Sequence, residues 1–599
     1  MRLGFFDIET NGITDWDHYS DLTDIHCICI YDTQDQKVHR YNTQRGDVEK
    51  ALDHLKECDA IVGHNSIGFD AKVLEKRFGF KHHTVYDTLV MARCIYPDLR
   101  NDDSKRRDFD KKLTGSHKLE AWGKRIGSLK GDFGASTDWS AWSQEMEDYC
   151  AQDVMVTKEL YYYLTRNPVS PQMLTLEHKF ATIIREQEQN GFPFDVEKAK
   201  QLTKKLMIRR VELEEELQKV FPPRTVAMKS CWWNTVDGRQ FPTKKAAVDS
   251  GYKAHDITKG APKTREVPFN PSSRDQIAER LIENGWKPKA FEGKRPAINE
   301  GTLKDIGTEQ SGKLLEYLLI AKRLGAVAEG AQAWMKAEKN GRVHGRVNTN
   351  GTLSGRCAHN RPNMGQVPAT RAPYGGECRE LFTAPKGKVL VGCDASGLEL
   401  RCLAHYLHAW DDGAYGRKIV EDDIHTVNQK AAGLETRDQA KTFIYAWLYG
   451  AGDAKIGSIV GGNAQHGKRL KENFLSKLPA VKRLMSAVKA KVDAKGILIG
   501  LDGRKLPVRS AHSALNLLLQ SAGAVVMKQA LIEFVFLATK PYEMHANVHD
   551  EVQFSCLEED AEVLGEEFVT AIRLAGMTLK FKCPLDGEYN VGANWKETH

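Results

Sequence analysis

One strand-like segment near the end of the chain interrupts its own pattern, and that interruption restricts what the chain can fold into. Apolar residues alternate over 544–548 and again over 552–556, as on two half-buried strands, with H-D-E at 549–551 between them. The pattern predicts a hairpin with both arms packed and the polar residues at its tip. Asp550 and Glu551 would repel each other there, and burying either charge is costly. Because tight turns favour Asp for local reasons too, the doublet indicates a site only if it has a partner elsewhere.

The size and composition of the chain restrict its class. Its 599 residues, 41% of them hydrophobic, are too many for one core and enough for several. A mean hydropathy of -0.48 and the lack of an apolar run of membrane-spanning length predict a protein without a membrane segment. The first residues enter a strand-like pattern at once, which leaves no room for a signal or transit peptide. Twelve cysteines without a C-x-x-C pair suggest neither a zinc site nor a disulfide framework and favour a reducing cytoplasm.

The positive charge of the chain is uneven. Net charge is +6, and residues 221–295 hold 15 Lys and Arg against 8 Asp and Glu. A local basic stretch rich in Gly and Pro fits a polyanion partner, and it equally fits a solvated, flexible surface. The sequence leaves both interpretations open.

Hydrophobic periodicity predicts several structural units. Residues 1–100 alternate strand-like and helical runs, which is an α/β pattern. The other expected elements are, in order, helices over 119–164, long amphipathic helices over 172–220 with a break at 191–195, an irregular stretch over 221–268, helices to about 339, strands over 340–410 and notably 388–393, mainly helices over 411–535, the hairpin, one more helix and a short tail.

Two acids share one face of the first strand. Asp7 and Glu9 are two residues apart, so their side chains point the same way. Paired carboxylates on a rigid face suit a hard cation such as Mg²⁺, although D-x-E alone also describes an exposed strand edge. Farther along, Asp70 follows an apolar strand, and Tyr149 and Asp153 lie four residues apart on one helix face.

The ordered set D-x-E, N-x-x-x-F-D and Y-x-x-x-D resembles the proofreading 3′–5′ exonuclease domains of the DnaQ-like family. The resemblance implies that Asp7, Glu9, Asp70 and Asp153 hold two metal ions and that Tyr149 helps to orient the attacking water. Two cations bridged by carboxylates stabilise both the attacking and the leaving oxygen of a phosphodiester. Four unrelated acids would not be expected to match in both order and spacing.

A second acid-bearing segment lies in the middle of the chain. K-V-L-V-G-C-D at 388–394 reads as a buried strand that ends at Asp394, and chain segments beyond strand ends commonly carry chemistry. In the turn that follows, Ser396 and Glu399 also fit a capping box, which would be a purely structural role.

The segment 436–450 predicts a helix with a capping box at its start and a glycine just beyond its end. Arg437, Lys441, Tyr445 and Tyr449 recur every four residues and therefore line one face. Two cations followed by two aromatic rings suit a nucleoside triphosphate, which needs positive charge for its phosphates and a flat ring for its sugar and base.

D-A-S-G-L-E, R-x-x-x-K-x-x-x-Y-x-x-x-Y-G and H-D-E resemble the three main motifs of family A DNA polymerases, and especially the replicative polymerases of short-tailed bacteriophages. Further likeness lies in S-G-R-C-A-H-N-R-P-N (354–363), Q-S-A-G-A (520–524), G-S-H-K-L-E-A-W (115–122) and F-N-P-S-S-R (269–274). The resemblance runs nearly from end to end. It implies an α/β and α+β multidomain protein, in which an RNase H-like exonuclease domain precedes a right-hand polymerase with an antiparallel palm sheet and helical fingers and thumb. The expected domains are the exonuclease (1–165), the thumb (166–339, with a short basic insertion at about 221–268), the palm (340–410 and 511–599) and the fingers (411–510).

By this resemblance Asp394 and Asp550 hold two metal ions, and the backbone carbonyl of Ala395 is a further ligand. Glu551 is a weaker candidate for a metal ligand, and it is expected to contact the ligands and not the ions. The expected cofactor is Mg²⁺, two ions at each site, with Mn²⁺ as the alternative. One ion lowers the pKa of the primer 3′-hydroxyl, and the other neutralises the triphosphate and the leaving pyrophosphate.

The resemblance also assigns the substrate contacts. Arg437, Lys441 and His425 contact the phosphates of the incoming dNTP. Tyr445 stacks near its sugar, Tyr449 lies beside the new base pair, and Glu399 fills the space of a ribose 2′-hydroxyl. The residues implied to touch the minor groove of the new duplex, where shared acceptors let donors test pair shape without reading sequence, are Arg356, Asn516, Gln520 and His549.

The expected function is therefore template-directed DNA synthesis with 3′–5′ proofreading, in the replication system of a phage and in the cytoplasm of an infected bacterium. Expected partners are primer-template DNA, dNTPs, a replisome helicase-primase and a single-strand binding protein, with no membrane. One phage member of the family recruits thioredoxin through a long thumb insertion. Because the stretch 221–268 is considerably shorter, thioredoxin recruitment is not carried over.

Two other functions share some of these features. A single-subunit RNA polymerase shares the metal-binding acids, but the nuclease motifs and Glu399 speak against it. A catalytically inactive DNA-binding protein could keep the fold, but it would not need all six carboxylates.

Overall fold

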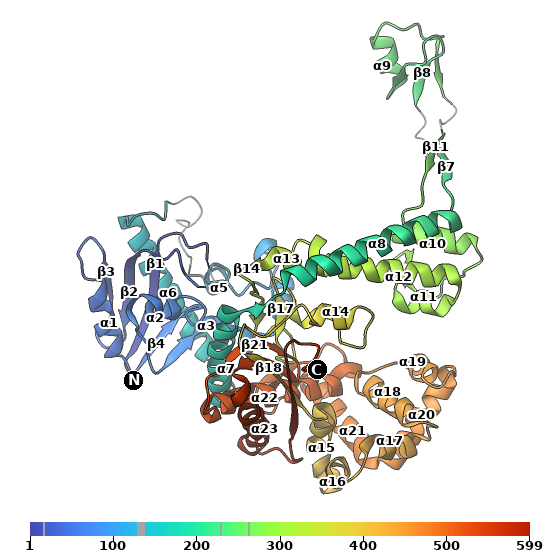
Figure 1. Ribbon diagram of the computed structural model, residues 1–599. Helices are drawn as coiled ribbons and strands as arrows, with labels where there is room; N and C mark the ends of the chain where they lie inside the picture. The colour runs from blue at the N-terminus through green and yellow to red at the C-terminus, as the bar shows by residue number, and fades with distance from the viewer. Residues whose placement is uncertain (16–17, 129–137, 167, 228–230, 261–263) are drawn as a thin grey trace. The chain divides into compact units, whose positions relative to one another are not determined.

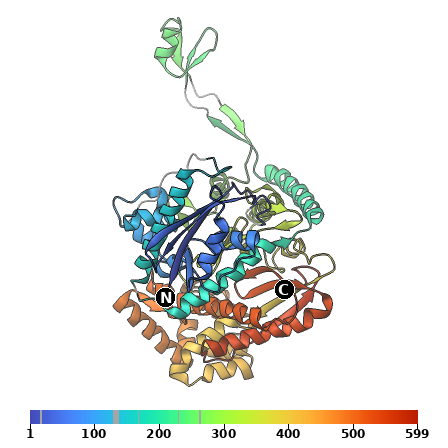
Figure 2. The same ribbon diagram turned by 90° about the vertical axis from the view of Figure 1, so that its left-hand side faces the viewer.

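The computed structural model describes residues 1–15, 18–128, 138–166, 168–227, 231–260 and 264–599. The chain forms two compact units: residues 1–195 together with 337–599, and residues 196–336. Figures 1 and 2 show the elements in two views.

A five-stranded mixed sheet organises the start of the first unit. Its strand order is β3-β2-β1-β4-β5; β1 is antiparallel to β2 and parallel to β4, β2 is antiparallel to β3, and β4 is parallel to β5. The strands are β1 (Leu3–Thr10), β2 (Ile25–Asp32), β3 (Lys37–Asn42), β4 (Ala60–Gly63) and β5 (Val85–Asp87). The α/β pattern predicted for residues 1–100 is thus confirmed.

Helices cover both faces of this sheet (Figures 1 and 2). Phe6 and Ile8 pack with α1 (Val48–Lys56) and α2 (Asp70–Phe78), whereas Phe5 packs with α6 (Gln144–Thr165). Because side chains alternate along a strand, Asp7 and Glu9 share the face of Phe5 and lie toward α6. The intervening elements are α3 (Thr88–Ile95), α4 (Leu99–Ser104), η1 (Lys111–Leu113) and α5 (Leu119–Ile126). Part of the helical prediction for 119–164, residues 129–137, lies outside the described residues.

Helix α7 (Pro171–Asn190) connects this sheet to the rest of the unit. It starts with Ser170 as its cap, whose Oγ accepts a hydrogen bond from the N–H of Met173, and it ends at Gly191, where φ is 61°. Its residues Leu176, Phe180 and Ile184 enter the large core of the unit.

A four-stranded antiparallel sheet is the centre of that core. Its order is β21-β22-β18-β23, formed by β18 (Val389–Ala395), β21 (Glu543–Val548), β22 (Glu551–Cys556) and β23 (Gly587–Gly592). Phe554 of β22 packs with Phe534 of α22 (Ala514–Leu537) and Phe568 of α23 (Ala561–Thr578). The predicted hairpin is confirmed, but Val548 pairs with Glu551, so only His549 and Asp550 form its turn. The prediction of a mere tail after the last helix is wrong, because β23 completes the sheet.

Mainly helices link β18 to β21, as predicted. They are α15 (Leu398–Asp411), α16 (Ala414–Glu421), α17 (Ile424–Ala432), α18 (Arg437–Leu448), α19 (Asp453–Ser458), α20 (Ala464–Lys477) and α21 (Pro479–Lys495), followed by the hairpin of β19 (Ile497–Ile499) and β20 (Lys505–Pro507), η5 (Ala511–Ser513) and α22. Short elements precede β18 or follow β22: β6 (Phe192–Pro193), β14 (Glu338–Lys339), β15 (Arg342–Val343), β16 (Arg346–Asn348), β17 (Ala358–Asn360), η4 (Met364–Gln366), α14 (Gly375–Arg379) and η6 (Glu558–Asp560).

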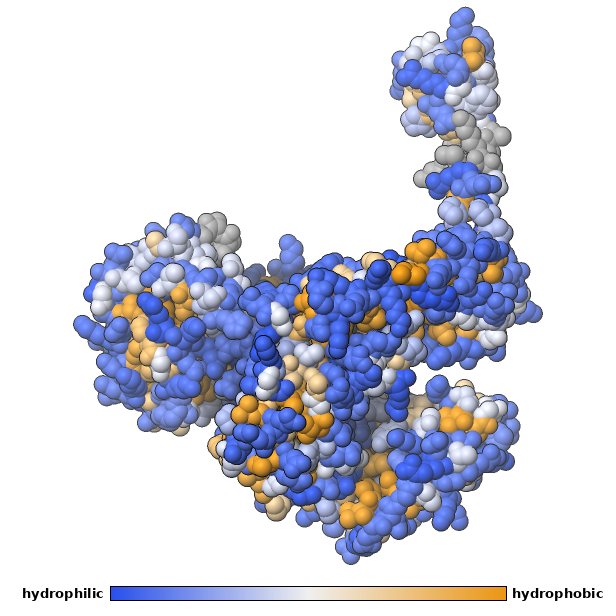
Figure 3. All heavy atoms as spheres, viewed as in Figure 1, coloured by the Kyte–Doolittle hydropathy of each residue, from blue (hydrophilic) through white to orange (hydrophobic). Residues whose placement is uncertain are grey.

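One segment has the length and composition of a membrane span. It is Ala511–Leu537, which comprises η5 and α22, and 67% of its most apolar window is buried inside the protein, as for the core helix of a globular domain. Hydrophilic residues dominate the face of the molecule shown in Figure 3.

The second unit is built on the antiparallel pairing of long helices. Its elements are α8 (Val196–Val220), α10 (Arg274–Glu283), β12 (Phe291–Glu292), β13 (Arg295–Pro296), α11 (Glu300–Ile306), α12 (Glu309–Leu324), the π-helical turn η3 (Gly325–Glu329) and α13 (Trp334–Ala337), which runs to the boundary of the unit.

The prediction that 221–268 is irregular is wrong for the described part of that stretch, which excludes 228–230 and 261–263. A ribbon of β7 (Arg224–Ala227) and β11 (Thr264–Val267) leads to a small module with a core of Phe241, Ala247 and Ile257. The elements of the module are β8 (Trp232–Asn234), β9 (Gln240–Phe241), α9 (Lys244–Asp249) and β10 (Ile257–Lys259). Strands of two to four residues are too short to show a period of two, which is why the sequence pattern missed them.

Candidate active sites

The four-stranded sheet brings Asp394 and Asp550 together. Asp394 lies near the end of β18, and Asp550 lies in the turn of the hairpin whose strand β22 pairs with β18. The backbone N–H of Ala395 donates a hydrogen bond to the carbonyl oxygen of Asp550 at 3.1 Å, which joins the two acidic segments directly. His549 supports the turn with a φ of 61°, a conformation that is uncommon outside glycine.

The pKa values of both carboxyl groups are raised. Burial, and then the charges of Asp550 and Glu551, raise the pKa of Asp394 to about 8. Burial, and then the charge of Glu399, raise the pKa of Asp550 to about 6. A divalent cation would relieve this repulsion, and the hard oxygen donors of the two carboxylates and of the Ala395 carbonyl fit Mg²⁺ or Mn²⁺.

Glu551 has different surroundings. It is buried, and its carboxylate accepts hydrogen bonds from Gln553 Nε2 at 2.8 Å and from the indole N–H of Trp595. Arg379 and His599 approach it at 3.5 and 3.0 Å. Gln553 lies in β22 itself, whereas the other partners come from the C-terminal residues and from α14, and no local sequence pattern indicates them. Glu551 is thus held by protein groups, in keeping with a place behind the metal ligands.

Glu399 lies in the first turn of α15 and faces two of the other predicted site residues. The hydroxyl of Tyr449 donates a hydrogen bond to Glu399 Oε1 at 3.1 Å, and Arg356 Nη2 lies 3.7 Å from the same oxygen. The capping box proposed for Ser396 and Glu399 is wrong, because Gly397, with φ of 59°, occupies the N-cap position and no side chain caps the helix. The Glu399 carboxylate therefore points to the site instead of the helix start.

Helix α18 presents the predicted face of two cations and two tyrosines. Its capping box is confirmed between Thr436 and Gln439. Arg437 is exposed and pairs with Asp423 at 2.6 Å. The pKa of His425 is lowered by burial and then by the charges of Arg437 and, more weakly, Lys441, so these three groups are neighbours.

Aromatic contacts complete this face. The rings of Tyr445 and His425 have centroids 6.2 Å apart. The negative charges of Glu399, Asp550 and Asp394 help burial to raise the pKa of Tyr445 to about 12. The α18 face therefore lies beside the acidic edge formed by Asp394 and Asp550.

The structure brings some of the predicted minor-groove residues together. Arg356 comes from the loop between β16 and β17, and after burial it is the largest contributor to the lowered pKa of His549, so the two side chains are neighbours. Asn516 and Gln520 lie one turn apart on α22, both partly exposed.

The four acids predicted for a nuclease also converge. Asp7 and Glu9 lie on β1, Asp70 begins α2, and Tyr149 and Asp153 lie on α6, which packs on β1. Burial, followed by the charge of Asp87 and then that of Asp153, raises the pKa of Asp70 to about 7. The carboxyl oxygens thus crowd one end of the sheet and fit divalent cations as the first site does.

Two residues beside these acids were missed from the sequence. Cys150 offers its sulfur within 4.8 Å of ligand oxygens of Asp7 and Glu9, and it follows Tyr149 directly. Asp87 is buried, and its carboxylate accepts hydrogen bonds from the backbone of Asn65, Ile67 and Leu89 at 2.8 to 3.1 Å. Asp87 is the N-cap residue of α3, and an Asp just before a helical pattern could have been recognised in the sequence.

A cavity of about 1200 Å³ opens beside the four acids of the first sheet and its helices. Its walls include Tyr149, Asn65 and Asp87 on one side and Arg346 and Asn348 of β16 on another. The cavity is thus shared between the part that contains the first sheet and the part that carries Arg356.

Comparison with known proteins shows which family the chain resembles. Residues 243–597 match the model of DNA polymerase family A. The chain is 36% identical to a DNA-directed DNA polymerase of Enterobacteria phage T3 and 35% identical to one of Escherichia phage T7, in each case over 99% of both chains. The alignment with the phage T3 protein spans 709 positions, so that relative has stretches that this chain lacks.

The fold also resembles a solved structure, described as the POL domain of Pol1 from M. smegmatis in complex with DNA primer-template and dNTP. The TM-score is 0.76 over 99% of this chain and 96% of that chain, at 18% identity, so this likeness concerns the fold alone. With a family match over more than half of its length and relatives above 30% identity along nearly all of it, the chain belongs to DNA polymerase family A.

Proposed function

We propose that the protein extends the 3′ end of a primer on a DNA template with deoxynucleoside triphosphates. The observation that carries this proposal is the meeting of Asp394 and Asp550 at one edge of the sheet, beside a helix face of two cations and two tyrosines. When bound there, two divalent cations would lower the pKa of the primer hydroxyl and offset the charge of the triphosphate and the leaving pyrophosphate.

Side chains of this protein would make the contacts to the nucleotide and the DNA. Arg437, Lys441 and His425 bind the phosphates, Tyr445 and Tyr449 support the sugar and the new pair, and Glu399 excludes a 2′-hydroxyl. Glu551 keeps the hairpin turn in place through its own buried partners. Arg356, His549, Asn516 and Gln520 contact the minor groove. The solved structure of similar fold, which is described as a complex with primer-template and dNTP, supports these two classes of ligand.

We propose in addition that residues 1–165 form an RNase H-like 3′–5′ exonuclease that removes mispaired ends. The convergence of Asp7, Glu9, Asp70 and Asp153 supports it, as does the mixed sheet with order β3-β2-β1-β4-β5. Tyr149 would orient the attacking water, and the four carboxylates would hold the cations that activate it.

The partners follow from the same assignment. Basic residues in 221–295 offer cations to the duplex backbone, and a helicase-primase and a single-strand binding protein would act on the same DNA. Because the stretch 221–268 is expected to be shorter than the thumb insertion that recruits thioredoxin in one phage member, a thioredoxin-type factor is not part of this proposal.

Two variants test both activities. Asp394→Ala should abolish primer extension with dNTPs and Mg²⁺ and leave degradation of single-stranded DNA within about twofold. Asp7→Ala should do the reverse. Loss of both activities in either folded variant would refute the two-site assignment, and a preference for rNTPs would favour the RNA polymerase alternative.

A further inference from the structure

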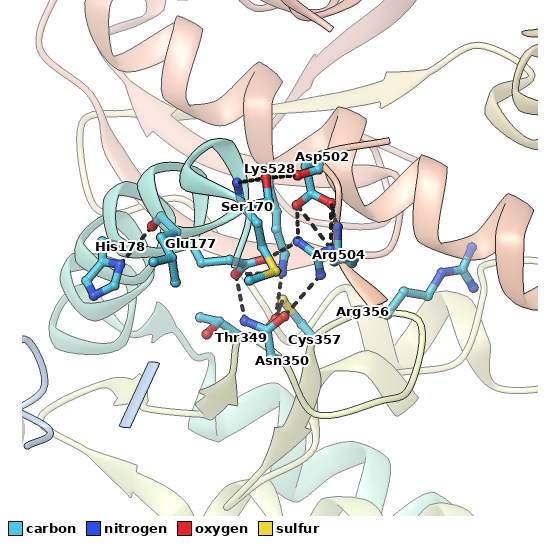
Figure 4. A network of polar contacts seen from close by, with 12 residues as sticks. Ser170, Glu177, His178, Thr349, Asn350, Arg356, Cys357, Asp502, Arg504 and Lys528 are labelled. Atoms are coloured by element: carbon cyan, nitrogen blue, oxygen red, sulfur yellow. Dashed lines mark hydrogen bonds and ion pairs between the residues drawn. The ribbon is translucent and has the colours of Figure 1, made fainter. Parts of the chain in front are cut away.

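A buried cluster of four charges lies behind the loop that carries Arg356. Its members are Glu177 of α7, Asp502 and Arg504 of the β19–β20 hairpin, and Lys528 of α22, each at most 4% exposed. Glu177 accepts from Lys528 Nζ at 2.7 and 2.9 Å and from Arg504. Asp502 accepts from Arg504 at 2.7 and 3.0 Å. The cluster is neutral as a whole and joins three elements that are distant in sequence (Figure 4).

The cluster holds the backbone and side chains at the base of the 349–357 loop. Asn350 donates to Glu177 at 2.7 Å and accepts from Arg504 at 3.2 Å. Lys528 donates to the carbonyl oxygen of Thr349 at 2.8 Å. A Cβ atom at Gly355, where φ is +78°, would lie 1.8 Å from Arg504 Nη1, so the chain just before Arg356 rests on the guanidinium.

The loop transmits this support to Arg356. The carbonyl oxygen of Arg356 accepts hydrogen bonds from Gly351 N–H at 3.2 Å and from Thr352 Oγ1 at 3.3 Å. Figure 4 shows the Arg356 side chain pointing away from the cluster, and its guanidinium lies 3.7 Å from Glu399. The cluster therefore fixes the backbone of Arg356 while leaving its side chain to face the site.

Stability alone does not explain the four charges. Buried ion pairs often stabilise a protein no better than apolar residues of the same volume, because desolvation offsets their attraction. Here the charged and amide groups satisfy one another's hydrogen bonds. Through Asn350 and Thr349 they also hold a loop that has only short strands on either side. Fixed hydrogen-bond geometry is what such a cluster supplies beyond an apolar core.

We propose that Glu177, Asn350, Arg504 and Lys528 are positioning residues that hold the Arg356 loop for recognition of the primer-terminal base pair. This inference rests on the proposed function, in which Arg356 contacts the minor groove. The four residues act through Arg356 and touch neither DNA nor nucleotide.

A double-mutant cycle on Asn350 and Arg356 tests the inference. Single-turnover extension is measured from matched and from mismatched primer ends, in full-length protein carrying Asp7→Ala so that degradation does not compete. Arg356→Ala should slow matched extension about 10–100-fold, as expected for loss of one good groove contact. Asn350→Ala removes the hydrogen bonds with Glu177 and Arg504; it should slow matched extension about fivefold and should reduce the preference for matched over mismatched ends. The double variant should equal Arg356→Ala within about twofold.

A matched control separates positioning from stability. Asn42 is also a buried asparagine that donates to a buried glutamate, Glu147, but it lies in the first sheet. Asn42→Ala should lower the Tm as Asn350→Ala does and leave the matched-to-mismatched ratio unchanged. If Asn350→Ala does not fold, Asn350→Ser takes its place in the cycle.

Every result of these measurements either supports or overturns the inference. Independent effects that multiply in the double variant would overturn the inference, as would an Asn350→Ala protein with wild-type selectivity beside an impaired Arg356→Ala protein. If Arg356→Ala itself extends matched and mismatched ends like the parent, the proposed groove contact fails first, and the positioning role fails with it.

Discussion

Asp394 and Glu551 are direct cross-strand partners in β18 and β22, yet their carboxyl groups have opposite surroundings. Burial and Asp550 raise the pKa of Asp394 to about 8. Burial also acts to raise the pKa of Glu551, but the hydrogen bond from His599 and the charge of Arg379 outweigh it, and the pKa lies below its usual range. Protein groups neutralise Glu551, whereas Asp394 is surrounded by negative charge. Of the two, Asp394 is therefore the better candidate ligand for a divalent cation.

Amide substitutions should separate these two roles. Asp394→Asn should lower the rate of primer extension by at least about 10³-fold, because a metal ligand supports several kcal/mol of transition-state stabilisation. Glu551→Gln should lower it about 10–100-fold, as for a residue that orients ligands, and should lower the Tm because it leaves Arg379 buried beside a neutral group. Single-turnover rates and calorimetry measure both effects. Equal losses of extension in the two variants would contradict the distinction.

The metal-free protein should lose stability as the pH rises. The folded pKa values of Asp394 and Asp550, about 8 and about 6, exceed the ordinary value of 3.8, so the folded state keeps protons that the unfolded chain has released. The loss of stability begins above about pH 4 and is complete above about pH 8. Asp70, whose pKa is about 7, also makes the folded protein less stable as the pH rises.

Mg²⁺ should oppose this loss because it binds the deprotonated folded site. The rise in Tm on replacing EDTA with Mg²⁺ should be at least about twofold larger at pH 8 than at pH 5.5. The difference should shrink in Asp394→Asn/Asp550→Asn, which retains only the nuclease acids. A Mg²⁺ effect that is the same at both pH values would contradict the prediction.

The contact between Tyr449 and Glu399 predicts sugar selection by two residues. Glu399→Ala should open the space of a 2′-hydroxyl and raise incorporation of rNTP relative to dNTP by about 10–200-fold, the range for one excluded group. Tyr449→Phe removes the hydroxyl that donates to Glu399 at 3.1 Å and that also contacts Arg356, and it should raise the ratio about fivefold. The ratio of kcat/KM for the two nucleotides is the measurement, and an unchanged ratio in Glu399→Ala would be incompatible with this role.

The pair between Arg437 and Asp423 predicts competition for the triphosphate. Asp423→Asn keeps the capping of α17, in which Asp423 accepts from His425 N–H at 3.2 Å, but removes the charge that holds Arg437. The KM for dNTP should fall about two- to threefold, with little change in Tm because the pair is exposed. Arg437→Ala should raise the KM at least about tenfold. A higher KM in Asp423→Asn would show that the pair positions Arg437 for binding.

The acids of both sites could be predicted from the sequence because local patterns determine where they lie. Asp7 and Glu9 alternate with apolar residues on a strand, Asp394 ends an apolar run, and Asp550 interrupts an alternating hairpin. Each pattern has a period or a boundary that a short window reveals. The helix face from Arg437 to Tyr449 was visible for the same reason.

The features that escaped prediction depend on tertiary partners. S-x-x-E at 396–399 matches a capping box, but Gly397 takes a left-handed conformation and starts the helix itself. Glu177 and Lys528 are 351 positions apart, and in the sequence each is one charged residue in an otherwise ordinary helix. Strand β23 is visible only once β18 offers it an open edge.

Helix α7 has a practical consequence for enzyme engineering. His178, next to Glu177, accepts a hydrogen bond from the backbone N–H of Asp87 at 2.9 Å, and Met173 packs on Val90 and Cys94. Cutting away residues 1–165 would expose Met173 and would remove the hydrogen-bond partner of His178, which is the neighbour in sequence of Glu177. If residues 1–165 are the proposed nuclease, an enzyme without proofreading should therefore be made by substitution at Asp7 or Glu9, because a shortened chain would also lose these contacts of α7.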